Sequence, residues 1–382
     1  MSKVTHRAKG KIPSNDSTPG QRKTDETQPQ PENSPGSTFK ELVALLSFAN
    51  ILLAHPLETC RLLALGIHQF GRQLFGYGFR PERDVIDQSG KVILITGGNI
   101  GLGRETVREL AKHRPARIYL AARNGQTAQK AIAAIKSELT QPVDIRHIPL
   151  DLSSFTSVRE AARLFTAECD RLDTLILNAG VMGQDPYSTE DGYEIQFGTN
   201  YMGHFLLTSL LIPTLRETAS KPGSDVRILS VSSIGWQMAP SSPSALLWLM
   251  TSTDELLKCN RWTRYGISKA ANILLASELA RRYPDIMSVS VHPGIILTAL
   301  YDQGKASTFV IKHGLGLIKP FASSEKNGAC NHLWAAGCER SQLRNGEYYT
   351  PVGIQAWENQ LVHDEGTSRR LWEWSEEQVA ER

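Results

Sequence analysis

The sequence of 382 residues lacks the usual signs of a disulfide-bonded or a metal-binding protein. Its five cysteines are scattered and none belongs to a Cys-x-x-Cys pair, so they indicate neither a disulfide framework nor a zinc site. Histidines such as His204 and His292 occur singly and not at the spacing of metal ligands. We therefore expect reduced thiols, an intracellular location and no bound metal.

A strong charge of either sign and an internal repeat are also missing. The net charge is +3, and no basic stripe alternates with aromatic residues as it does in many nucleic-acid-binding proteins. Without a repeat, a solenoid or a propeller is excluded as well. The composition thus favours an ordinary globular protein that has no nucleic-acid partner.

Large apolar residues are rare in residues 1–38, which are rich in Ser, Thr, Pro, Gln and Lys. Such a segment cannot bury enough apolar surface to become ordered, so we expect a disordered tail. It contains neither the apolar stretch of a signal peptide nor the arginine pattern of a transit peptide.

An apolar run of transmembrane length is absent from residues 39–87, although this segment is strongly apolar in two places, at 42–54 and 62–67. Neither run reaches the roughly 20 residues needed to cross a bilayer, and Glu58 and Arg61 lie between them. Two interpretations stay open for this helical extension. It either lies on a membrane or lipid-droplet surface or forms a helix pair packed on the domain that follows.

From Lys91 onward, the sequence shows alternating strand and helix signals. They predict an α/β fold with one Rossmann-type, doubly wound parallel sheet, formed by residues 88–382 as a single domain. The expected strands, about seven, are residues 91–96, 117–122, 144–150, 173–178, 226–231, 288–292 and 346–350. A capped helix should begin within residues 323–329, and a final helix should lie in residues 361–382.

A glycine-rich turn follows the first predicted strand. Residues 97–103 run Gly-x-x-x-Gly-x-Gly, and the helix predicted for 104–113 comes directly after them. Glycines let the backbone turn tightly and approach a pyrophosphate, whose charge the amino end of the helix stabilises. The strand, turn and helix together favour a dinucleotide-binding site over a plain turn.

The end of the second predicted strand bears on the choice of cofactor. A carboxylate there would bind a free ribose 2′-hydroxyl, but the sequence has Arg123 and Asn124 instead. Arg104 is a second cation close to the glycine turn. We therefore favour NADP(H) over NAD(H), the alternative being that both arginines are ordinary surface charges.

Tyr265 and Lys269 are spaced to share one face of a helix, so both can reach the same bound molecule. A nearby ammonium favours the ionised form of a phenol and makes it a better acid-base catalyst at neutral pH. The pair is therefore a candidate for proton transfer, although an exposed helix face could carry it as well.

Taken together, these segments resemble the short-chain dehydrogenase/reductase family, in particular its retinol-dehydrogenase-like branch and related fungal oxidoreductases. The resemblance covers roughly residues 88–350. It rests on several short motifs that follow the order of the family, namely residues 96–103, 151–152, 178–180, 200–205, 231–233, 265–269 and 292–294, with Thr298 after them.

The resemblance implies a role for each catalytic candidate. Tyr265 is the expected acid-base, and Lys269 is expected to favour the phenolate and hold the nicotinamide ribose. Ser233, rather than the neighbouring Ser232, would orient the substrate oxygen, and Asn200 would support a water-linked proton route from Lys269. Besides Tyr265 and Lys269, the resemblance implies that the cofactor contacts Gly97, Asn99, Gly101, Leu102, Gly103, Arg123, Asp151, Leu152, Asn178, Ala179, Ile296 and Thr298.

The segment between Ser233 and Tyr265 is longer than in compact members of this family. Residues 245–250 and Trp262 make it partly apolar, which suggests a lid over the site and a lipophilic substrate. The alternative is a docking patch for a homodimer. We expect an oxidoreductase that transfers a hydride between the nicotinamide and a lipophilic alcohol or carbonyl, the alternative being a catalytically idle nucleotide-binding scaffold or sensor.

Overall fold

The computed structural model describes residues 78–294, 324–356 and 360–380. The expected disordered tail and most of the expected helical extension therefore lie outside the described residues. Two residues that the family resemblance places at the cofactor, Ile296 and Thr298, also lie outside them.

Eight strands form one sheet in the described part of the chain, in the order β3-β2-β1-β4-β5-β6-β7-β8. β1 to β7 pair in parallel, as expected. The strands are β1 Val92–Thr96, β2 Arg117–Ala122, β3 Asp144–Pro149, β4 Thr174–Leu177, β5 Arg227–Val231, β6 Met287–Val291, β7 Tyr348–Thr350 and β8 Ile354–Gln355. All seven predicted strands are thus confirmed. β8 was not predicted: it is two residues long, antiparallel to β7, and too short to give a sequence signal.

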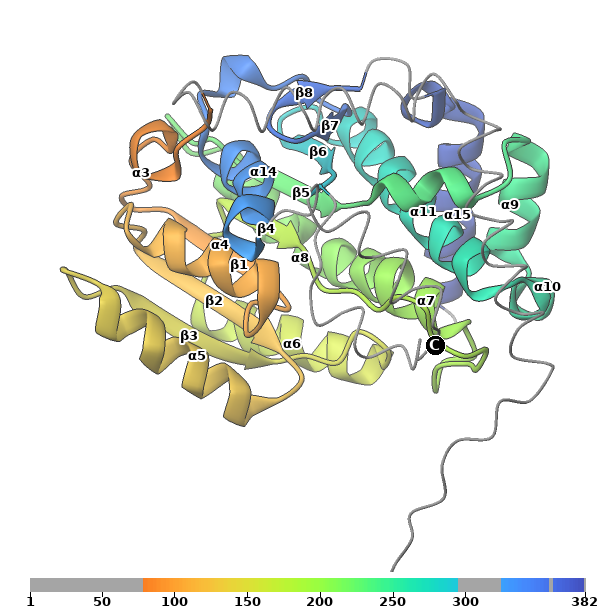
Figure 1. The fold of residues 1–382 in the computed structure, drawn as a ribbon, viewed down its shortest axis with the longest axis horizontal. Coiled ribbons are helices and arrows are strands. Elements are labelled where there is room, and N and C mark those ends of the chain that lie inside the picture. The colour runs from red at the N-terminus through yellow and green to blue at the C-terminus, as the bar shows by residue number, and fades with distance from the viewer. Residues whose placement is uncertain (1–77, 295–323, 357–359, 381–382) are drawn as a thin grey trace, which may run out of the picture.

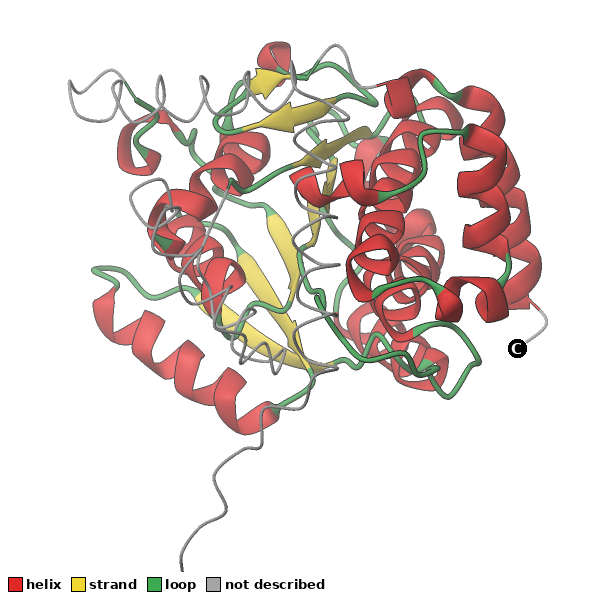
Figure 2. Ribbon diagram, turned by 45° about the vertical axis from the view of Figure 1, so that its right-hand side comes forward, coloured by secondary structure: helices red, strands yellow, loops and turns green. Residues whose placement is uncertain are grey.

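Helices cover both faces of the sheet (Figures 1 and 2). α4, α5 and α14 lie on one face, and α6, α8 and α11 lie on the other. The helices are α3 Pro81–Asp84, α4 Gly101–Ala111, α5 Gly125–Glu138, α6 Phe155–Glu168, α7 Ile195–Phe197, α8 Gly203–Ala219, α9 Pro243–Thr251, α10 Thr253–Lys258, α11 Arg261–Arg282, α14 Glu325–Gly337 and α15 Glu365–Ala380. The predicted capped helix and final helix are confirmed as α14 and α15.

The alternation of side chains along the strands separates two hydrophobic clusters. In β1, Leu94 faces the cluster beneath α6, α8 and α11, whereas Ile93 and Ile95 face the cluster beneath α4, α5 and α14. All three side chains are at most 2% exposed. This two-sided burial explains why the predicted strands read as continuous apolar runs.

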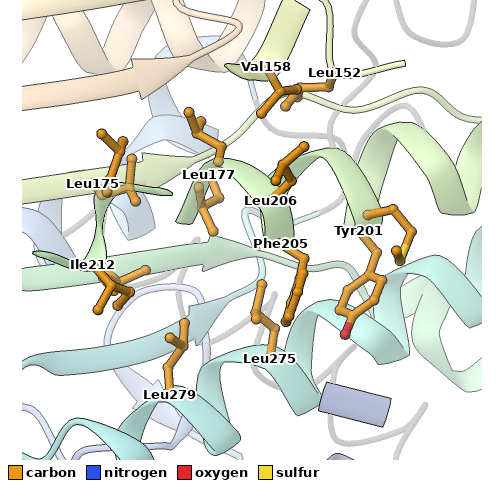
Figure 3. Close-up of a cluster of buried hydrophobic side chains, with 14 of the residues drawn as sticks. Leu152, Val158, Leu175, Leu177, Tyr201, Phe205, Leu206, Ile212, Leu275 and Leu279 are labelled. Atoms are coloured by element: carbon orange, nitrogen blue, oxygen red, sulfur yellow. The ribbon is translucent and has the colours of Figure 1, made fainter. Parts of the chain in front are cut away.

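The larger of the two clusters, which lies beneath α6, α8 and α11, fixes α11, the helix that contains Tyr265 and Lys269. Figure 3 shows Leu275 of α11 close to Phe205 of α8, with Leu175 and Leu177 of β4 in the same cluster. Each fully buried leucine of this kind contributes about 1.5–3 kcal/mol relative to an exposed one. α11 is therefore held firmly against the sheet along most of its length.

The strand order places a topological switch point at the carboxyl ends of the central strands β1 and β4. β1 lies between β2 and β4, so the chain leaves the carboxyl ends of β1 and β4 toward opposite faces. In open parallel sheets, ligands bind in the crevice at this switch point. Thr96 ends β1, and Asn178 follows β4, so two of the expected cofactor segments meet here.

The apolar insertion between Ser233 and Tyr265 forms α9 and α10, which lie beside α11 and α15 at one end of the molecule (Figure 1). Leu246, Met250 and Leu256 are buried in the larger cluster, whereas Trp248 is 54% exposed. The expectation that this whole segment forms a lid is therefore wrong for the three buried side chains, because they complete the core.

The short helix α3 and Val85 pack against α14. A Cβ atom on Gly337 would overlap with Val85, and the backbone N–H of Ile86 donates to Gly337 O. Among the residues described, no helix has the length and apolar character needed to cross a membrane. The same residues contain no group of three or more His, Cys, Asp or Glu side chains suited to a metal ion.

Candidate active site

The glycine turn after β1 is shaped for close approach of a ligand to the backbone. Gly97 and Gly101 have φ angles of +66° and +55°, which L-residues with side chains rarely adopt. A Cβ atom on Gly97 would lie 3.1 Å from Ala179, and one on Gly103 would overlap with the carbonyl of Gly97. Glycine is thus required at three of the positions that the sequence singled out.

The amino end of α4 is open to an anion. Ile100 precedes the helix without a side-chain hydrogen bond to it, and the first turn contains no acidic residue. The backbone amides at the start of the helix, which include those of Leu102 and Gly103, are suited to a phosphate. Asn99 donates from Nδ2 to Thr127 Oγ1 at 2.7 Å and so connects the turn to α5. The residues here fit the pyrophosphate of a dinucleotide.

Two arginines lie near this turn, and their side chains differ in solvent exposure. Arg123, just after β2, is 77% exposed and only 3.6 Å from Asp151 Oδ2. Arg104, on α4, is 44% exposed and 3.6 Å from Glu325 Oε2. Since Arg123 is the more exposed, it is the better placed of the two to bind a further phosphate group.

Asp151 and Leu152 follow β3 and have different surroundings. Asp151 Oδ1 accepts hydrogen bonds from the backbone and the hydroxyl of Ser153, which holds its carboxylate at the end of the strand. Leu152 is 5% exposed and points into the larger cluster (Figure 3). Only the backbone of Leu152 remains for the cofactor contact that the family resemblance implies.

A buried hydrogen-bond chain joins the cofactor turn to Asn200. The Thr96 hydroxyl accepts the backbone N–H groups of Asn178 and Ala179, both at 2.9 Å, which leaves its own proton for His204 Nε2, also at 2.9 Å. His204 Nδ1 then donates to the carbonyl of Asn200 at 2.9 Å. Burial lowers the pKa of His204 to about 3, so the ring is neutral and can play both roles.

Asn200 lies in a π-helical turn, η1 Gly198–Met202, between α7 and α8. Its side chain accepts the N–H of Val181 at 2.8 Å and donates to the carbonyl of Val181 and the hydroxyl of Ser268, each at 2.9 Å. Turns of this type interrupt α-helices frequently at functional sites. The amide thus connects the end of β4 to the helix that carries Lys269.

Lys269 is 4% exposed and lies close to both Asn200 and Tyr265. Its Nζ donates to Val231 O at 2.9 Å and lies 5.8 Å from the centre of the Tyr265 ring. A Cβ atom on Gly180 would be 3.0 Å from Asn200 Oδ1 and 3.5 Å from Lys269 Nζ. Burial lowers the pKa of Lys269 to about 8, so its proton can be released near neutral pH.

The two serines after β5 have different surroundings. Ser232 is buried, and its hydroxyl donates to the carbonyl of Lys269 at 2.7 Å. Ser233 is half-buried, and among the residues described its hydroxyl accepts the N–H of Gly235 at 3.1 Å, so it can still donate its proton to a ligand. A Cβ atom on Gly235 would lie 2.7 Å from Cε1 of Tyr265, which places the Ser233 turn directly against that ring.

The structure thus gathers the four catalytic candidates around the crevice that begins at the glycine turn. Sequence reasoning missed several polar residues that hold them, including Ser268, His204, Gln196, Glu194 and Arg264. Ser268 could have been found from its place between Tyr265 and Lys269. Glu194 and Arg264 are 70 residues apart, so no local pattern predicts their ion pair.

Comparison with known proteins agrees with this geometry. The family description for short chain dehydrogenases matches residues 91–245. An uncharacterized oxidoreductase of Schizosaccharomyces pombe is 37% identical over 76% of this chain and 86% of its own length. The chain belongs to the short-chain dehydrogenase/reductase family.

Relatives within this short-chain dehydrogenase/reductase family include retinol dehydrogenases. Mouse retinol dehydrogenase 12 is 35% identical over 74% of this chain and 84% of its own length. Among solved structures, the NADP complex of RhlG from Pseudomonas aeruginosa matches with a TM-score of 0.55 and 20% identity, covering 72% of this chain and 98% of its own. The expected family and Rossmann-type fold are confirmed, and the chain is an oxidoreductase of this family.

Proposed function

We propose that this protein is an NADP(H)-dependent oxidoreductase that interconverts a lipophilic alcohol and the corresponding carbonyl compound. The observation that carries the proposal is that Asn200, Tyr265 and Lys269 lie close together, near a glycine turn and an amino end of α4 that are suited to the phosphates of a dinucleotide. A bound nicotinamide would supply or take up the hydride.

The side chains of this site provide the matching proton. Tyr265 would donate its hydroxyl proton to the oxygen of a carbonyl substrate during reduction, or accept one from an alcohol during oxidation. The half-buried Ser233 hydroxyl can donate to the same oxygen, which stabilises its developing charge. Lys269 can replace the proton of Tyr265, because its pKa of about 8 is close to neutral.

The preference for NADP(H) is supported by the surroundings of Arg123. An exposed guanidinium just after β2 is a suitable partner for a 2′-phosphate. The NADP complex of the structurally similar RhlG agrees with this choice. The preference for a lipophilic substrate is supported by the kinship with a retinol dehydrogenase. Association with a membrane or lipid-droplet surface and formation of a homodimer stay part of the proposal.

Trp262 of the insertion lies against the loop that follows β4. Its ring tip would lie 3.9 Å from a Cβ atom on Gly183, in the loop that follows β4. An aromatic side chain at this place is suited to contact the apolar part of a substrate.

The test is a screen of the purified full-length protein with NADPH or NADP against a panel of lipophilic ketones, aldehydes and alcohols. Absorbance of the reduced nicotinamide reports turnover. We expect activity with at least one lipophilic pair and weaker activity with NADH. Tight binding of NADPH without turnover of any compound would instead indicate a scaffold or sensor.

A further inference from the structure

Arg264 and Glu194 form an ion pair in which both side chains are almost completely buried, at 2% and 0% exposure. Arg264 Nη1 lies 2.6 Å from Glu194 Oε1. Taking two charges out of water is costly, and a well-packed apolar pair of similar size is often at least as stable. Stability alone therefore does not explain why charged residues occupy these positions.

Arg264 holds three separate segments at once. Besides the ion pair, its Nε donates to the carbonyl of Cys259 at 3.2 Å and its Nη2 to that of Gln184 at 2.9 Å. Cys259 directly follows α10, and Gln184 belongs to the loop after β4. Only a planar guanidinium offers donors in several fixed directions, so a lysine could not make this set of contacts.

Glu194 extends the connection toward Asn200. Its Oε2 accepts the N–H groups of Gln196 and Phe197, at 3.0 and 2.8 Å, and so caps the short helix α7. α7 continues directly into the π-helical turn that carries Asn200. The position of Asn200 is thus coupled to the position of the carboxylate.

Arg264 stands immediately before Tyr265 in the first turn of α11. A second contact set parallels the ion pair: Gln196 accepts the N–H of Gly183 at 2.8 Å and donates to the carbonyl of Arg261 at 2.9 Å. Both sets join α7, the loop after β4 and the start of α11. The start of α11 is therefore fixed by polar contacts, whereas its later turns are fixed by apolar packing.

We propose that Arg264 and Glu194 are a positioning pair that sets the separation between Tyr265 and Asn200, and thereby the proton route of the reaction. This inference rests on the proposed oxidoreductase function. Misplacing a catalytic group by about 1 Å can reduce the rate about 100-fold, even when the altered residue lies away from the reacting atoms. The pair contacts neither end of the glycine turn, so cofactor affinity is not expected to depend on it.

The experiment compares Arg264→Met, Glu194→Gln and the double variant with the wild-type full-length protein. Each single change leaves one buried charge without its partner and should lower the melting temperature clearly. The double variant removes both charges, while the glutamine oxygen can still cap α7. Its melting temperature should lie closer to that of the wild type than those of the single variants do.

The decisive readout is kcat of the double variant. We expect it to fall about 100-fold, with the NADPH dissociation constant within about threefold of the wild type. The pH dependence of kcat should also shift, because Tyr265 and Asn200 no longer share their normal geometry. A stable double variant with kcat within about threefold of the wild type would overturn the inference, since the pair would then be merely structural.

Two further variants serve as controls. Arg227→Met removes the other completely buried arginine, which donates to the carbonyls of Ala335 and Cys338 and lies at the amino end of β5, away from the crevice. It should lower the melting temperature without changing kcat of the folded protein. Arg264→Lys keeps the positive charge but loses the fixed donor directions of the guanidinium. The variant should therefore fold, and its kcat should still be about tenfold lower. Full activity of Arg264→Lys would also overturn the inference, even if the double variant did not fold.

The outcomes separate this inference from the function on which it rests. Wild-type protein that binds NADPH but turns over no compound of the panel would contradict the proposed function and the inference with it. An active wild type together with an equally active double variant would contradict the inference alone.

Discussion

The part of the site that is expected to bind the cofactor and the part that contains the catalytic candidates differ in the kinds of groups that form them. The cofactor side consists of glycines, free backbone amides and exposed cations, with Arg123 at 77% and Arg104 at 44% side-chain exposure. The catalytic side consists of polar side chains, of which Asn200 is 0%, Lys269 4% and Tyr265 6% exposed, while Ser233 is half-buried. Cofactor binding and proton transfer therefore depend on different kinds of groups in neighbouring parts of one site.

This difference has a physical reason. A pyrophosphate can be bound by backbone amides and by the amino end of a helix, so no charged side chain has to leave water. Proton transfer needs groups whose pKa values differ from those in water, and burial supplies that shift, as it does for Lys269. Changes on the cofactor side should therefore alter the cofactor dissociation constant, and changes on the catalytic side should alter kcat.

The largest expected effect is that of Tyr265→Phe. The variant keeps the ring that packs against Gly235 but loses the proton donor, so kcat should fall about 100- to 10,000-fold. The NADPH dissociation constant should change little. Steady-state kinetics and fluorescence titration check the two quantities. Tyr119→Phe is the matched control, because Tyr119 is fully buried in β2 and its hydroxyl contacts Arg117; a similar loss in both variants would contradict the assignment.

Lys269→Met should lose about 100- to 1,000-fold in kcat and yet be more stable than the wild type at pH 7. The pKa of Lys269 falls from 10.5 to about 8 on folding, so below pH 8 the folded state bears the full cost of the buried charge. At about 1.4 kcal/mol per pKa unit this cost is about 3 kcal/mol, and the lost hydrogen bond to Val231 offsets about 1 kcal/mol.

The pH dependence sharpens this prediction for Lys269. Between pH 8 and 10.5 the unfolded chain binds the proton more tightly than the folded chain, so the wild type gains stability as the pH rises through this window. The difference between Lys269→Met and the wild type should therefore shrink from pH 7 to pH 9. Chemical denaturation at both pH values measures it, and a constant difference would show that folding does not lower the pKa of Lys269.

Gly103→Ala tests the cofactor side. The new methyl group would overlap with the carbonyl of Gly97, so the turn has to move away from the shape that suits a pyrophosphate. Restoring that shape on binding costs about 1–3 kcal/mol, which raises the NADPH dissociation constant about 10- to 100-fold. At saturating cofactor kcat should stay close to that of the wild type. Gly125→Ala is the control, since its methyl group would make only an ordinary contact with His147, at 3.5 Å. An unchanged dissociation constant would show that the cofactor does not approach this turn.

The smallest expected effect is that of Arg123→Asp on the choice of cofactor. The carboxylate would repel a 2′-phosphate and accept a hydrogen bond from a free 2′-hydroxyl, so the preference for NADPH over NADH should fall about tenfold. Because the side chain is exposed, the effect should weaken as salt is added. Arg163→Asp, an exposed change on α6, should leave the preference unchanged. Equal ratios for Arg123→Asp and the wild type would place the phosphate elsewhere.

The cofactor side could be predicted from sequence because its signals are local. The strand before Gly97, the glycine spacing and the helix after it all lie within residues 92–111, and φ above zero at Gly97 follows from that pattern. The seven parallel strands were equally predictable, since burial on both faces makes each an apolar run. β8 was not predicted, because its two residues, Ile354 and Gln355, are too short a segment to show any periodicity.

The catalytic side was predictable only in part. Tyr265 and Lys269 share one helix, so their spacing was informative, but the bonds of Asn200 to Val181 and Ser268 span separate elements. Apolar periodicity also does not predict which helix or strand the apolar face of a helix will pack against. Leu246 was therefore expected to belong to a lid, although it packs in the core beside α11 and α15.

The central claim is that the phenol of Tyr265 faces a nicotinamide bound from the glycine turn. The most direct measurement uses NADPH that carries deuterium at the transferable position of C4, incubated with a turned-over ketone and analysed by mass spectrometry. We expect one deuterium at the carbinol carbon of the product, and almost no product with Tyr265→Phe. A product without deuterium, or labelled product formed equally well by Tyr265→Phe, would contradict the claim.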